Sequence, residues 1–211
     1  IRLNPLSLFN AECKFFNKKI DFFIIGAQKC GTTSLHDYMN QHPFCTGALR
    51  KETLFFTKKY RGTVTLERLV GHFSFKKLMR NRGKCLFFES TPDNVYEEAA
   101  PGRIYKYNPK AKLIFLVREP VSRAISEYNM ACKYAIVKNL CVREDPEREY
   151  FDYLRQPDKY PFEWFVKEEF RRMEETGSRL PSAFHYPDFI RHGLYSEQLE
   201  RYLQYFSPEQ I

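Results

Sequence analysis

The segment formed by residues 21–40 constrains the fold of this chain more than any other. An apolar run, Phe22-Phe23-Ile24-Ile25, is followed by a loop bounded by Gly26 and Gly31 and then by a helical pattern that begins at Thr32. Glycines allow the backbone to turn tightly and to approach an anion, and the first amides of a helix have no partner within the helix. This order predicts a buried strand, a phosphate-binding turn and a helix whose N-terminus faces the ligand.

The position of the lysine separates this loop from the phosphate-binding loop of nucleoside triphosphatases. That loop reads G-x-x-x-x-G-K-[ST], with the lysine directly after the second glycine. Here Gly26 and Gly31 have the same spacing, but Thr32 stands at the lysine position and Lys29 lies inside the loop. A lysine there can place a mobile positive charge beside a phosphate. The loop therefore indicates a nucleotide phosphate that is bound differently from ATP with magnesium.

Short apolar runs and helical patterns alternate along the chain. The runs predict buried parallel strands at residues 21–25, 85–88 and 113–117. The helical patterns occupy residues 32–40, 66–79, 104–107, 121–134, 161–175 and 196–205. Such alternation is typical of an α/β fold. We expect a P-loop-like three-layer sandwich with a central parallel sheet and helices on both faces, and a long surface excursion at residues 139–160.

The composition indicates a single globular domain. Hydrophobic residues make up 43% of the chain and aromatic residues 17%, which is too apolar for a disordered protein. No apolar run approaches the roughly 20 residues that span a bilayer, so we expect no membrane contact within this segment. We expect residues 1–211 to form one domain that is incomplete at its C-terminus, because the chain stops where a further strand could begin.

Charge and cysteine content leave several alternatives open. The net charge of +8 fits either a generally basic surface or a protein that binds an anionic ligand. The 6 cysteines form no C-x-x-C pair, so we expect no zinc ribbon and no metal site. Cys30 and Cys85 are expected to be buried thiols, and Cys132 could pair with Cys141.

A second polar cluster follows the third predicted strand, in the sequence Arg118-Glu119-Pro120-Val121-Ser122-Arg123-Ala124-Ile125-Ser126-Glu127-Tyr128. Pro120 can start a helix, which leaves Arg118 at the end of the strand. Ser122 and Ser126 are four residues apart and share a helix face. An arginine with a serine hydroxyl suits a second phosphate group. On spacing alone, a salt-bridged arginine with solvent-facing serines is the favoured interpretation, because ion pairs and capping serines are common.

Taken together, the two clusters resemble sulfotransferases that use 3′-phosphoadenosine 5′-phosphosulfate (PAPS). The first cluster resembles the 5′-phosphosulfate loop of that family. The second resembles its 3′-phosphate motif, R-x-P-x-x-R-x-x-S-x-Y, which is matched at Arg118, Pro120, Arg123, Ser126 and Tyr128. The order of the two motifs and the strands and helices predicted between them strengthen the resemblance.

Further segments resemble the Golgi carbohydrate branch of the family, which includes heparan and chondroitin sulfotransferases. The sequence Lys51-Glu52-Thr53-Leu54-Phe55-Phe56 is similar to the K-E-x-x-F-F segment of that branch, and Glu89-Ser90-Thr91-Pro92 is similar to its E-x-T-P segment. Residues 192–206 resemble its late helix. The likeness extends over about residues 21–211 and implies a carbohydrate acceptor.

The resemblance implies in-line transfer of a sulfuryl group from PAPS to a hydroxyl or amine, without a metal ion and with adenosine 3′,5′-bisphosphate as the product. It implies that Glu52 is the base and that Lys29 stabilises the developing charge. The 5′ end of PAPS would be bound by Lys29, Cys30, Gly31, Thr32, Thr33 and Ser34, and the 3′ phosphate by Arg118 and Ser126. The acceptor would be bound by Lys51, Glu89 and Thr91.

The identity of the base has competing interpretations. Glu52 could be an ordinary surface carboxylate paired with Lys51 or Arg50. Some heparan enzymes carry a histidine two residues after this glutamate, where this chain has Leu54. The histidines that could serve as the base instead are His42, His72, His185 and His192.

Two other functions compete with sulfate transfer. A P-loop phosphoryl transferase would need a lysine at position 32 and an aspartate at a strand end for magnesium. A non-catalytic binder of acidic polysaccharide or nucleic acid would fit the charge, but the basic residues are dispersed, so we expect no nucleic-acid partner. The acceptor and the oligomeric state are left open. A glycan-directed eukaryotic enzyme would act in the Golgi lumen, and otherwise we expect a cytoplasmic protein.

Overall fold

The computed structural model describes residues 18–57, 73–74, 77, 80–81, 84–138, 148–176 and 188–211. These residues divide into two units, which are described separately. The sheet unit contains the described residues of 18–27, 31–116 and 198–211, and the helical unit contains those of 28–30 and 117–197. The helix predicted at residues 66–79 lies almost wholly outside the described residues.

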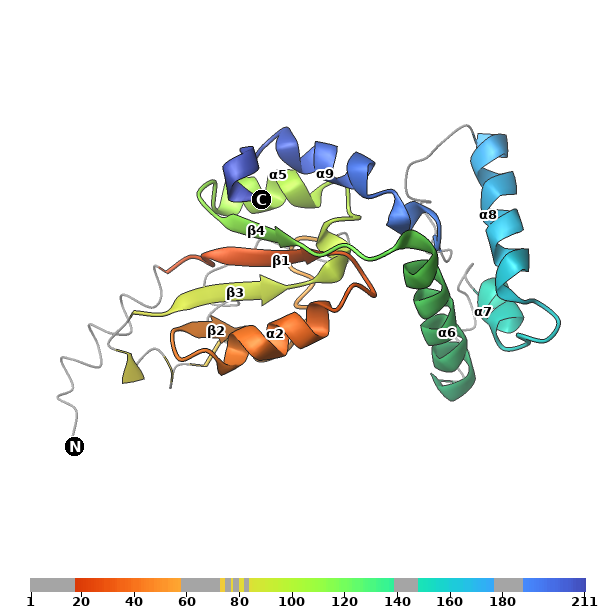
Figure 1. Ribbon diagram of the computed structural model, residues 1–211, viewed down its shortest axis with the longest axis horizontal. Coiled ribbons are helices and arrows are strands. Elements are labelled where there is room, and N and C mark those ends of the chain that lie inside the picture. The colour runs from red at the N-terminus through yellow and green to blue at the C-terminus, as the bar shows by residue number, and fades with distance from the viewer. Residues whose placement is uncertain are drawn as a thin grey trace. The chain divides into compact units, whose positions relative to one another are not determined.

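The described strands form a 4-stranded parallel sheet in the order β2-β3-β1-β4 (Figure 1). The strands are β1 (Phe22–Gly26), β2 (Cys45–Gly47), β3 (Leu86–Ser90) and β4 (Lys112–Phe115). In the central strand, Phe22 is in register with Phe88 of β3 and with Lys112 of β4. The three predicted strands are confirmed as β1, β3 and β4. Strand β2 was not predicted, because Cys-Thr-Gly contains no apolar run.

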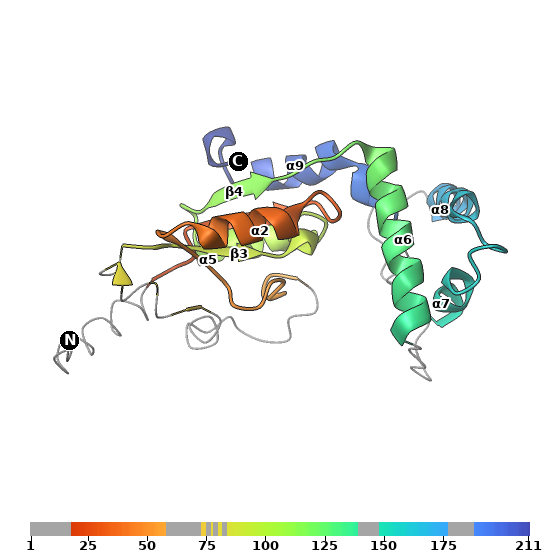
Figure 2. The same cartoon turned by 60° about the horizontal axis from the view of Figure 1, so that its bottom comes forward.

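Helix α2 (Thr32–Gln41) covers one face of this sheet (Figure 2). Phe22 and Phe88 stack with ring centroids 5.0 Å apart, and Leu35 and Met39 of α2 pack against the cluster that contains them. Burial of large apolar and aromatic side chains provides the main stabilisation of such a layer. The predicted helix at residues 32–40 is confirmed.

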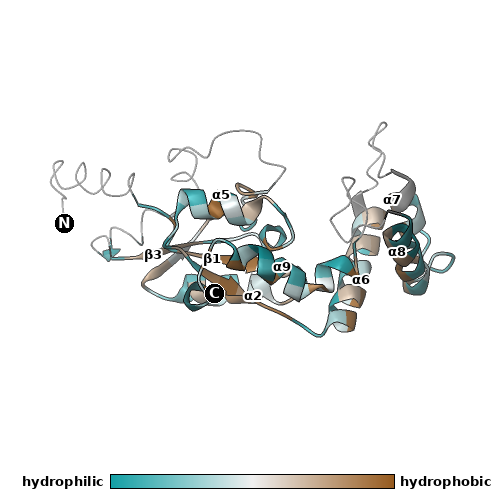
Figure 3. Ribbon diagram, turned by 90° about the horizontal axis from the view of Figure 1, so that it is seen from above, coloured by the Kyte–Doolittle hydropathy of each residue, from teal (hydrophilic) through white to brown (hydrophobic). Residues whose placement is uncertain are grey.

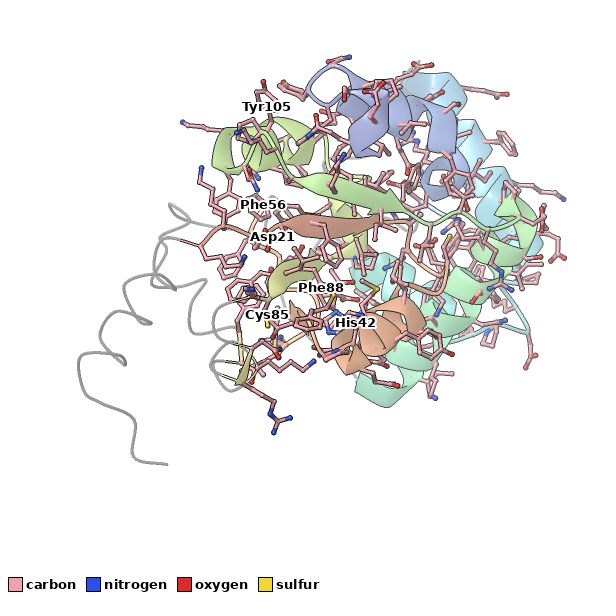
Figure 4. The ribbon with its side chains drawn as sticks, turned by 60° about the vertical axis from the view of Figure 1, so that its left-hand side comes forward. Asp21, His42, Phe56, Cys85, Phe88 and Tyr105 are labelled. Atoms are coloured by element: carbon pink, nitrogen blue, oxygen red, sulfur yellow. The ribbon has the colours of Figure 1, made fainter. Side chains whose placement is uncertain are left out.

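Helix α5 (Ala100–Tyr107) covers the opposite face. Alternate residues of a strand point to opposite faces, so Phe23 points away from α2. Its ring centroid lies 5.4 Å from that of Phe56 and 6.4 Å from that of Tyr107 on α5. Figure 4 shows Phe88 close to α2 and Phe56 on the side of α5. The predicted sandwich with helices on both faces is therefore confirmed. Helix α9 (Tyr195–Leu203) confirms the last predicted helix.

The described helices of the helical unit are α6 (Pro120–Lys138), α7 (Arg148–Leu154) and α8 (Phe162–Thr176), with a short 3₁₀ turn at Arg191–Gly193. Each of α6 and α8 carries both hydrophobic and hydrophilic residues (Figure 3). The described part of this unit has an apolar core, which contains Ala124, Tyr128, Cys132, Ala135, Leu154, Phe165 and Phe189. Helix α7 lies within the surface excursion expected at residues 139–160, where no helix was predicted.

The described cysteines correct one expectation. Cys85 is buried as predicted, whereas Cys30 is only partly buried. Cys132 is a buried free thiol, and Cys141 lies outside the described residues.

The helical unit also buries charged side chains. Arg123 has 0% exposure, and its Nη1 lies 2.5 Å from Glu127 Oε2. Glu127 Oε1 lies 2.7 Å from His192 Nδ1. Burial acts to raise the pKa of Glu127, but the charges and hydrogen bonds of His192 and Arg123 outweigh it and lower this pKa. The cluster joins α6 to the segment that precedes α9.

Glu169 of α8 makes the stability of the helical unit depend on pH. Its carboxylate accepts hydrogen bonds from the amides of Ile190 at 2.9 Å and Arg191 at 3.0 Å. Burial raises the pKa of Glu169 from 4.5 to about 7, and the neighbouring Asp188 adds to this shift. The pKa of Glu169 is higher in the folded protein than in the unfolded chain, so the folded state binds this proton more tightly. The resulting contribution to the free energy of unfolding is complete below the unfolded pKa and is lost as pH rises through about 7.

We therefore expect Glu169→Gln to flatten the fall of melting temperature between about pH 5 and pH 8. Part of the slope should remain, because the pKa of His192 is also raised. Thermal unfolding followed by circular dichroism over this range measures the effect. Glu163→Gln, on the exposed side of the same helix, is the control. If melting temperature fell with pH as steeply in Glu169→Gln as in the wild type, the raised pKa of Glu169 would be contradicted.

Candidate functional site

The loop after β1 depends on two glycines for different reasons. A Cβ atom on Gly26 would lie 2.3 Å from Val95 Cγ1, so no side chain fits without displacing this neighbour. The amide of Leu116 donates to the carbonyl of Gly26 at 2.8 Å, which ties the loop to the end of β4. Gly31 has a φ of 84°, in the left-handed region that favours glycine. Its backbone directs the chain into α2.

The N-terminus of α2 has the properties of an anion site. Within the described residues, no side chain caps this terminus and no acidic residue lies in its first turn. Thr32 is buried, whereas the hydroxyls of Thr33 and Ser34 lie on exposed residues. The free amides and the helix dipole favour negative charge here. The amide of Leu35 is the first to bond within the helix, to Gly31 O at 3.1 Å.

Lys29 and Cys30 belong to the helical unit. Lys29 has a φ of 66°, an uncommon conformation for a residue with a side chain. Its Nζ lies 3.5 Å from the sulfur of Met130 on α6. Its carbonyl accepts a hydrogen bond of 3.5 Å from Arg118 Nη1. Among the described residues, the ammonium of Lys29 forms no ion pair with a carboxylate, so its charge is available for an anion.

Tyr195 connects Cys30 with Arg118. Its hydroxyl donates to the carbonyl of Arg118 at 2.8 Å and accepts from the amide of Arg118 at 3.4 Å. The same oxygen lies 3.6 Å from Cys30 Sγ. Burial raises the pKa of Tyr195 to about 12, so the hydroxyl keeps its proton at neutral pH. No motif in the sequence indicates this role of Tyr195, although the residue lies in the segment 192–206 that resembles the family.

The motif around Arg118 divides into an accessible part and a buried part. Arg118 is exposed and Ser126 is partly exposed. Arg123 and Tyr128 are buried, and the hydroxyl of Tyr128 donates to the carbonyl of Tyr160 at 3.1 Å. The accessible residues are those predicted to bind the 3′ phosphate, and the buried residues hold α6 in the helical unit.

Helix α6 begins differently from α2. The carboxylate of Glu119 accepts hydrogen bonds from the amides of Val121 at 2.8 Å and Ser122 at 2.7 Å. Hydrogen bonds from Ser122 and Val121 lower the pKa of Glu119. Since a side chain of the protein already occupies these amides, an anion near α6 would depend on side chains such as Arg118.

Glu52 lies in the loop of residues 51–57, which we call the carboxylate loop. Its side chain is 50% exposed and pairs with Lys51, with Nζ 2.5 Å from Oε1. The pairing that the sequence left open is therefore present. An exposed pair of this kind contributes little free energy and opens readily. Glu52 and Leu54 both have left-handed backbones, with φ of 62° and 59°.

Glu89 and Thr91 lie at the end of β3, beneath this loop. Glu89 has 0% exposure and Thr91 has 1%. The Glu89 carboxylate accepts hydrogen bonds from Thr53 Oγ1 at 2.9 Å, from Asn94 Nδ2 at 3.2 Å and from the hydroxyl of Thr91. Burial raises the pKa of Glu89. The side chain of Glu89 has no exposed surface in this structure, so its polar atoms face the protein interior.

The histidines proposed as rival bases have other partners or cannot be placed. His42 Nδ1 accepts a hydrogen bond from the amide of Phe44 at 3.3 Å, and His192 belongs to the buried charge cluster. His72 and His185 lie outside the described residues. Glu52 differs from these histidines in being a half-exposed carboxylate of the carboxylate loop.

The predicted site residues follow the carboxyl ends of parallel strands, where ligands bind in open α/β sheets. In the sheet unit, the loop before α2 follows β1, and the amide of Glu52 donates to Ser90 O at the end of β3, at 3.0 Å. In the helical unit, Lys29, Cys30 and Arg118 are joined through the contacts described above. No described helix is long and apolar enough to cross a membrane. The described residues contain no cluster of three metal-binding side chains.

Comparisons with known proteins show which family and fold the chain resembles. A family model described as "Sulfotransferase domain" matches residues 19–211. Heparan sulfate glucosamine 3-O-sulfotransferase 5 of Mus musculus is 30% identical over 188 residues, which cover 89% of this chain and 45% of that protein. The human bifunctional heparan sulfate N-deacetylase/N-sulfotransferase 3 is 25% identical over 193 residues, which cover 90% of this chain and 19% of that protein. The chain thus spans less than half the length of these relatives.

A solved structure provides an independent comparison. A sulfotransferase from Alicyclobacillus acidocaldarius superposes with a TM-score of 0.59 and 26% sequence identity. The superposition covers 92% of this chain and 71% of that one.

Proposed function

The chain belongs to the sulfotransferase family, and we propose that it transfers a sulfuryl group from PAPS to a hydroxyl or amine of a carbohydrate. The observation that carries the proposal is the uncapped N-terminus of α2, which follows a loop with its lysine at position 29. This terminus suits the phosphate and sulfate oxygens of the donor. The displaced lysine distinguishes the loop from one that binds ATP with magnesium.

The donor would be held through charge and hydrogen bonds of the chain itself. The 5′ phosphosulfate would accept hydrogen bonds from the backbone at Cys30 and Gly31 and from the amides and hydroxyls of Thr32, Thr33 and Ser34. When the acceptor oxygen attacks sulfur, the bond from sulfur to the bridging oxygen breaks and its electron pair remains on the departing phosphate. Lys29 would stabilise this new negative charge. This account requires no metal ion, and adenosine 3′,5′-bisphosphate leaves as the product.

Glu52 would remove the proton of the attacking hydroxyl or amine. Its carboxylate is half exposed and has Lys51 as its ion-pair partner. A general base must reach the proton that it removes, and an acceptor could displace the lysine from so exposed a pair. Lys51 would then be free to contact an anionic group of the acceptor, as the sequence predicted. Thr91 is buried, so its predicted contact with the acceptor would require the loop to open.

The 3′ phosphate would be bound by Arg118 and Ser126, with Tyr195 holding the backbone of Arg118 in place. We expect Arg118→Ala to weaken binding of adenosine 3′,5′-bisphosphate by about 10- to 100-fold, because a charge-assisted bidentate contact is lost. Tyr195→Phe removes one hydroxyl and should weaken binding by about fivefold. Isothermal titration calorimetry measures both.

Matched variants control for non-specific effects. Arg80→Ala removes an exposed arginine and Tyr205→Phe removes the hydroxyl of an exposed tyrosine, so both should bind the nucleotide as the wild type does. Wild-type affinity in Arg118→Ala would exclude Arg118 as a ligand of the 3′ phosphate.

A carbohydrate acceptor is supported by the names of the relatives, two of which specify heparan sulfate. The net charge of +8 favours an acidic glycan among carbohydrates. The test is transfer of radiolabelled sulfate from PAPS to a panel of heparan and chondroitin glycans, phenols and simple alcohols. Label in a glycan is the expected result. Label confined to phenols or simple alcohols would refute the carbohydrate acceptor.

A further inference from the structure

We propose that Glu89 is a positioning residue, which holds the carboxylate loop so that Glu52 presents its carboxylate to the acceptor. This inference rests on the proposed function, since it concerns the base of the same reaction. Glu89 would thus fix the position of the loop, in place of the direct contact with the acceptor that the sequence predicted. The contacts that support it all lie within the sheet unit.

The carboxylate loop has a backbone that requires external support. Glu52 and Leu54 both have positive φ, at 62° and 59°. Residues with side chains avoid this left-handed region, and such conformations persist only where the surroundings determine them. The two left-handed conformations lie close together, at Glu52 and Leu54, and the side chain of Glu52 is half exposed. If the support were lost, both residues would relax to ordinary backbone angles and the carboxylate would move.

The support comes from the end of β3. The amide of Glu52 donates to Ser90 O at 3.0 Å. Both the amide and the hydroxyl of Thr53 donate to Glu89 Oε1, at 3.4 and 2.9 Å. The amide of Leu54 donates to Thr91 Oγ1 at 3.3 Å. Three consecutive residues of the loop are thus bonded to three consecutive residues of the strand end.

Glu89 organises this set of contacts. Its Oε1 accepts from Thr53 and from the hydroxyl of Thr91, so it orients the oxygen that receives the amide of Leu54. Its Oε2 accepts from Asn94 Nδ2 at 3.2 Å, and the carbonyl of Asn94 accepts from Tyr202 OH at 2.8 Å. A buried carboxyl group is stable only when it is hydrogen-bonded in this way. Glu89 therefore links the loop to α9.

Burial raises the pKa of Glu89, which favours its uncharged form. The carbonyl oxygen of an uncharged carboxyl group still accepts hydrogen bonds from Thr53 and Thr91. Glutamine has the same shape and offers Thr53 and Thr91 the same kind of acceptor. Its NH2 group would face Asn94 Nδ2, so the Asn94 side-chain amide would turn over and accept through Oδ1, a buried atom that lacks a partner. A glutamine at position 89 should therefore preserve the support, whereas an apolar side chain should not.

Three variants test the role of Glu89. Glu89→Gln should keep kcat within about threefold of the wild type, whereas Glu89→Leu and Thr53→Val should lower kcat by about tenfold or more, because the base loses its position. Binding of adenosine 3′,5′-bisphosphate should change less than about twofold in all three, since the donor site is unaltered. Amide hydrogen exchange at Thr53 and Leu54 should be faster in the two damaging variants.

Thr46→Val is the matched control. Thr46 is a buried threonine of β2 in the same unit, with 1% exposure, and lies outside the carboxylate loop. It should leave kcat and loop exchange unchanged. If Glu89→Leu fails to fold, Thr53→Val still removes the side-chain contact to Glu89, and thermal unfolding shows whether that variant is native.

The outcomes separate this inference from the proposed function. Wild-type kcat and loop exchange in Glu89→Leu and Thr53→Val, together with loss of transfer in Glu52→Gln, would overturn the role of Glu89 and leave the proposed function intact. Equal losses in Glu89→Gln and Glu89→Leu would also overturn it, because the conservative variant would not have rescued activity. Absence of sulfate transfer by the wild type would overturn both proposals.

Discussion

Replacing Lys29 with alanine is expected to lower kcat for sulfate transfer by about 100- to 1,000-fold, the loss typical of removing one group that stabilises charge in the transition state. Lys29 Nζ lies near Met130 Sδ, and no carboxylate within the described part of the chain pairs with it. Its charge would therefore act on the phosphate that departs with the bridging oxygen. Steady-state transfer of labelled sulfate measures kcat, and single-turnover reactions measure the transfer step separately from product release.

Two variants make the Lys29 result specific. Lys29→Met keeps the length of the side chain and should lose as much activity as alanine, because the charge is the property that matters. Lys110→Ala removes an exposed lysine of the sheet unit and should leave kcat unchanged. Both Lys29 variants should still bind adenosine 3′,5′-bisphosphate through the N-terminus of α2. Full activity in Lys29→Ala would refute the assigned role.

Glu52→Gln is the other change with a large expected effect. It preserves size but removes the base, so kcat should fall by about 100- to 10,000-fold. The loop backbone should not respond, because the contacts at Thr53 and Leu54 involve Glu89 and Thr91. Loss of the ion pair with Lys51 should hardly affect stability, since exposed pairs contribute little. Rates of labelled sulfate transfer across a range of pH provide the measurement.

The control for Glu52 is another exposed carboxylate of the sheet unit. Glu98→Gln removes a charge of the same kind and should retain the kcat of the wild type. A Glu52→Gln variant with wild-type kcat would mean that a different group removes the proton, and the assignment of Glu52 would then be wrong.

The sequence predicted those elements whose burial is visible in a continuous pattern. Strand β1 is a run of apolar residues, and α2 follows a glycine loop that marks its start. Strand β2 has only three residues and a polar centre, Thr46, so its pairing with β3 depends on tertiary contacts. Helix α7 lies within a charged segment, where hydrophobic spacing gives a weak signal.

Residues of the candidate site could be predicted only where they belong to a recognisable sequence motif. Lys29, Glu52 and Arg118 are recognisable by their positions in sequence motifs. The hydrogen bond from Thr53 to Glu89 joins residues 36 positions apart, and the hydroxyl of Tyr195 reaches Arg118 across 77 positions. Local sequence does not encode such contacts, because they depend on how the fold brings distant segments together. The burial of Glu89, which was predicted to contact the acceptor, is the clearest case, because local sequence does not show which segments cover a side chain.

Transfer from two labelled donors to a heparan-type glycan distinguishes a sulfotransferase from a phosphoryl transferase. One reaction contains PAPS labelled in its sulfate, and the other contains ATP labelled in its terminal phosphate, each with magnesium and with a chelator. We expect labelled sulfate in the glycan both with magnesium and with the chelator, and no transfer of labelled phosphate. Magnesium-dependent transfer of phosphate from ATP, without any transfer of sulfate, would contradict it.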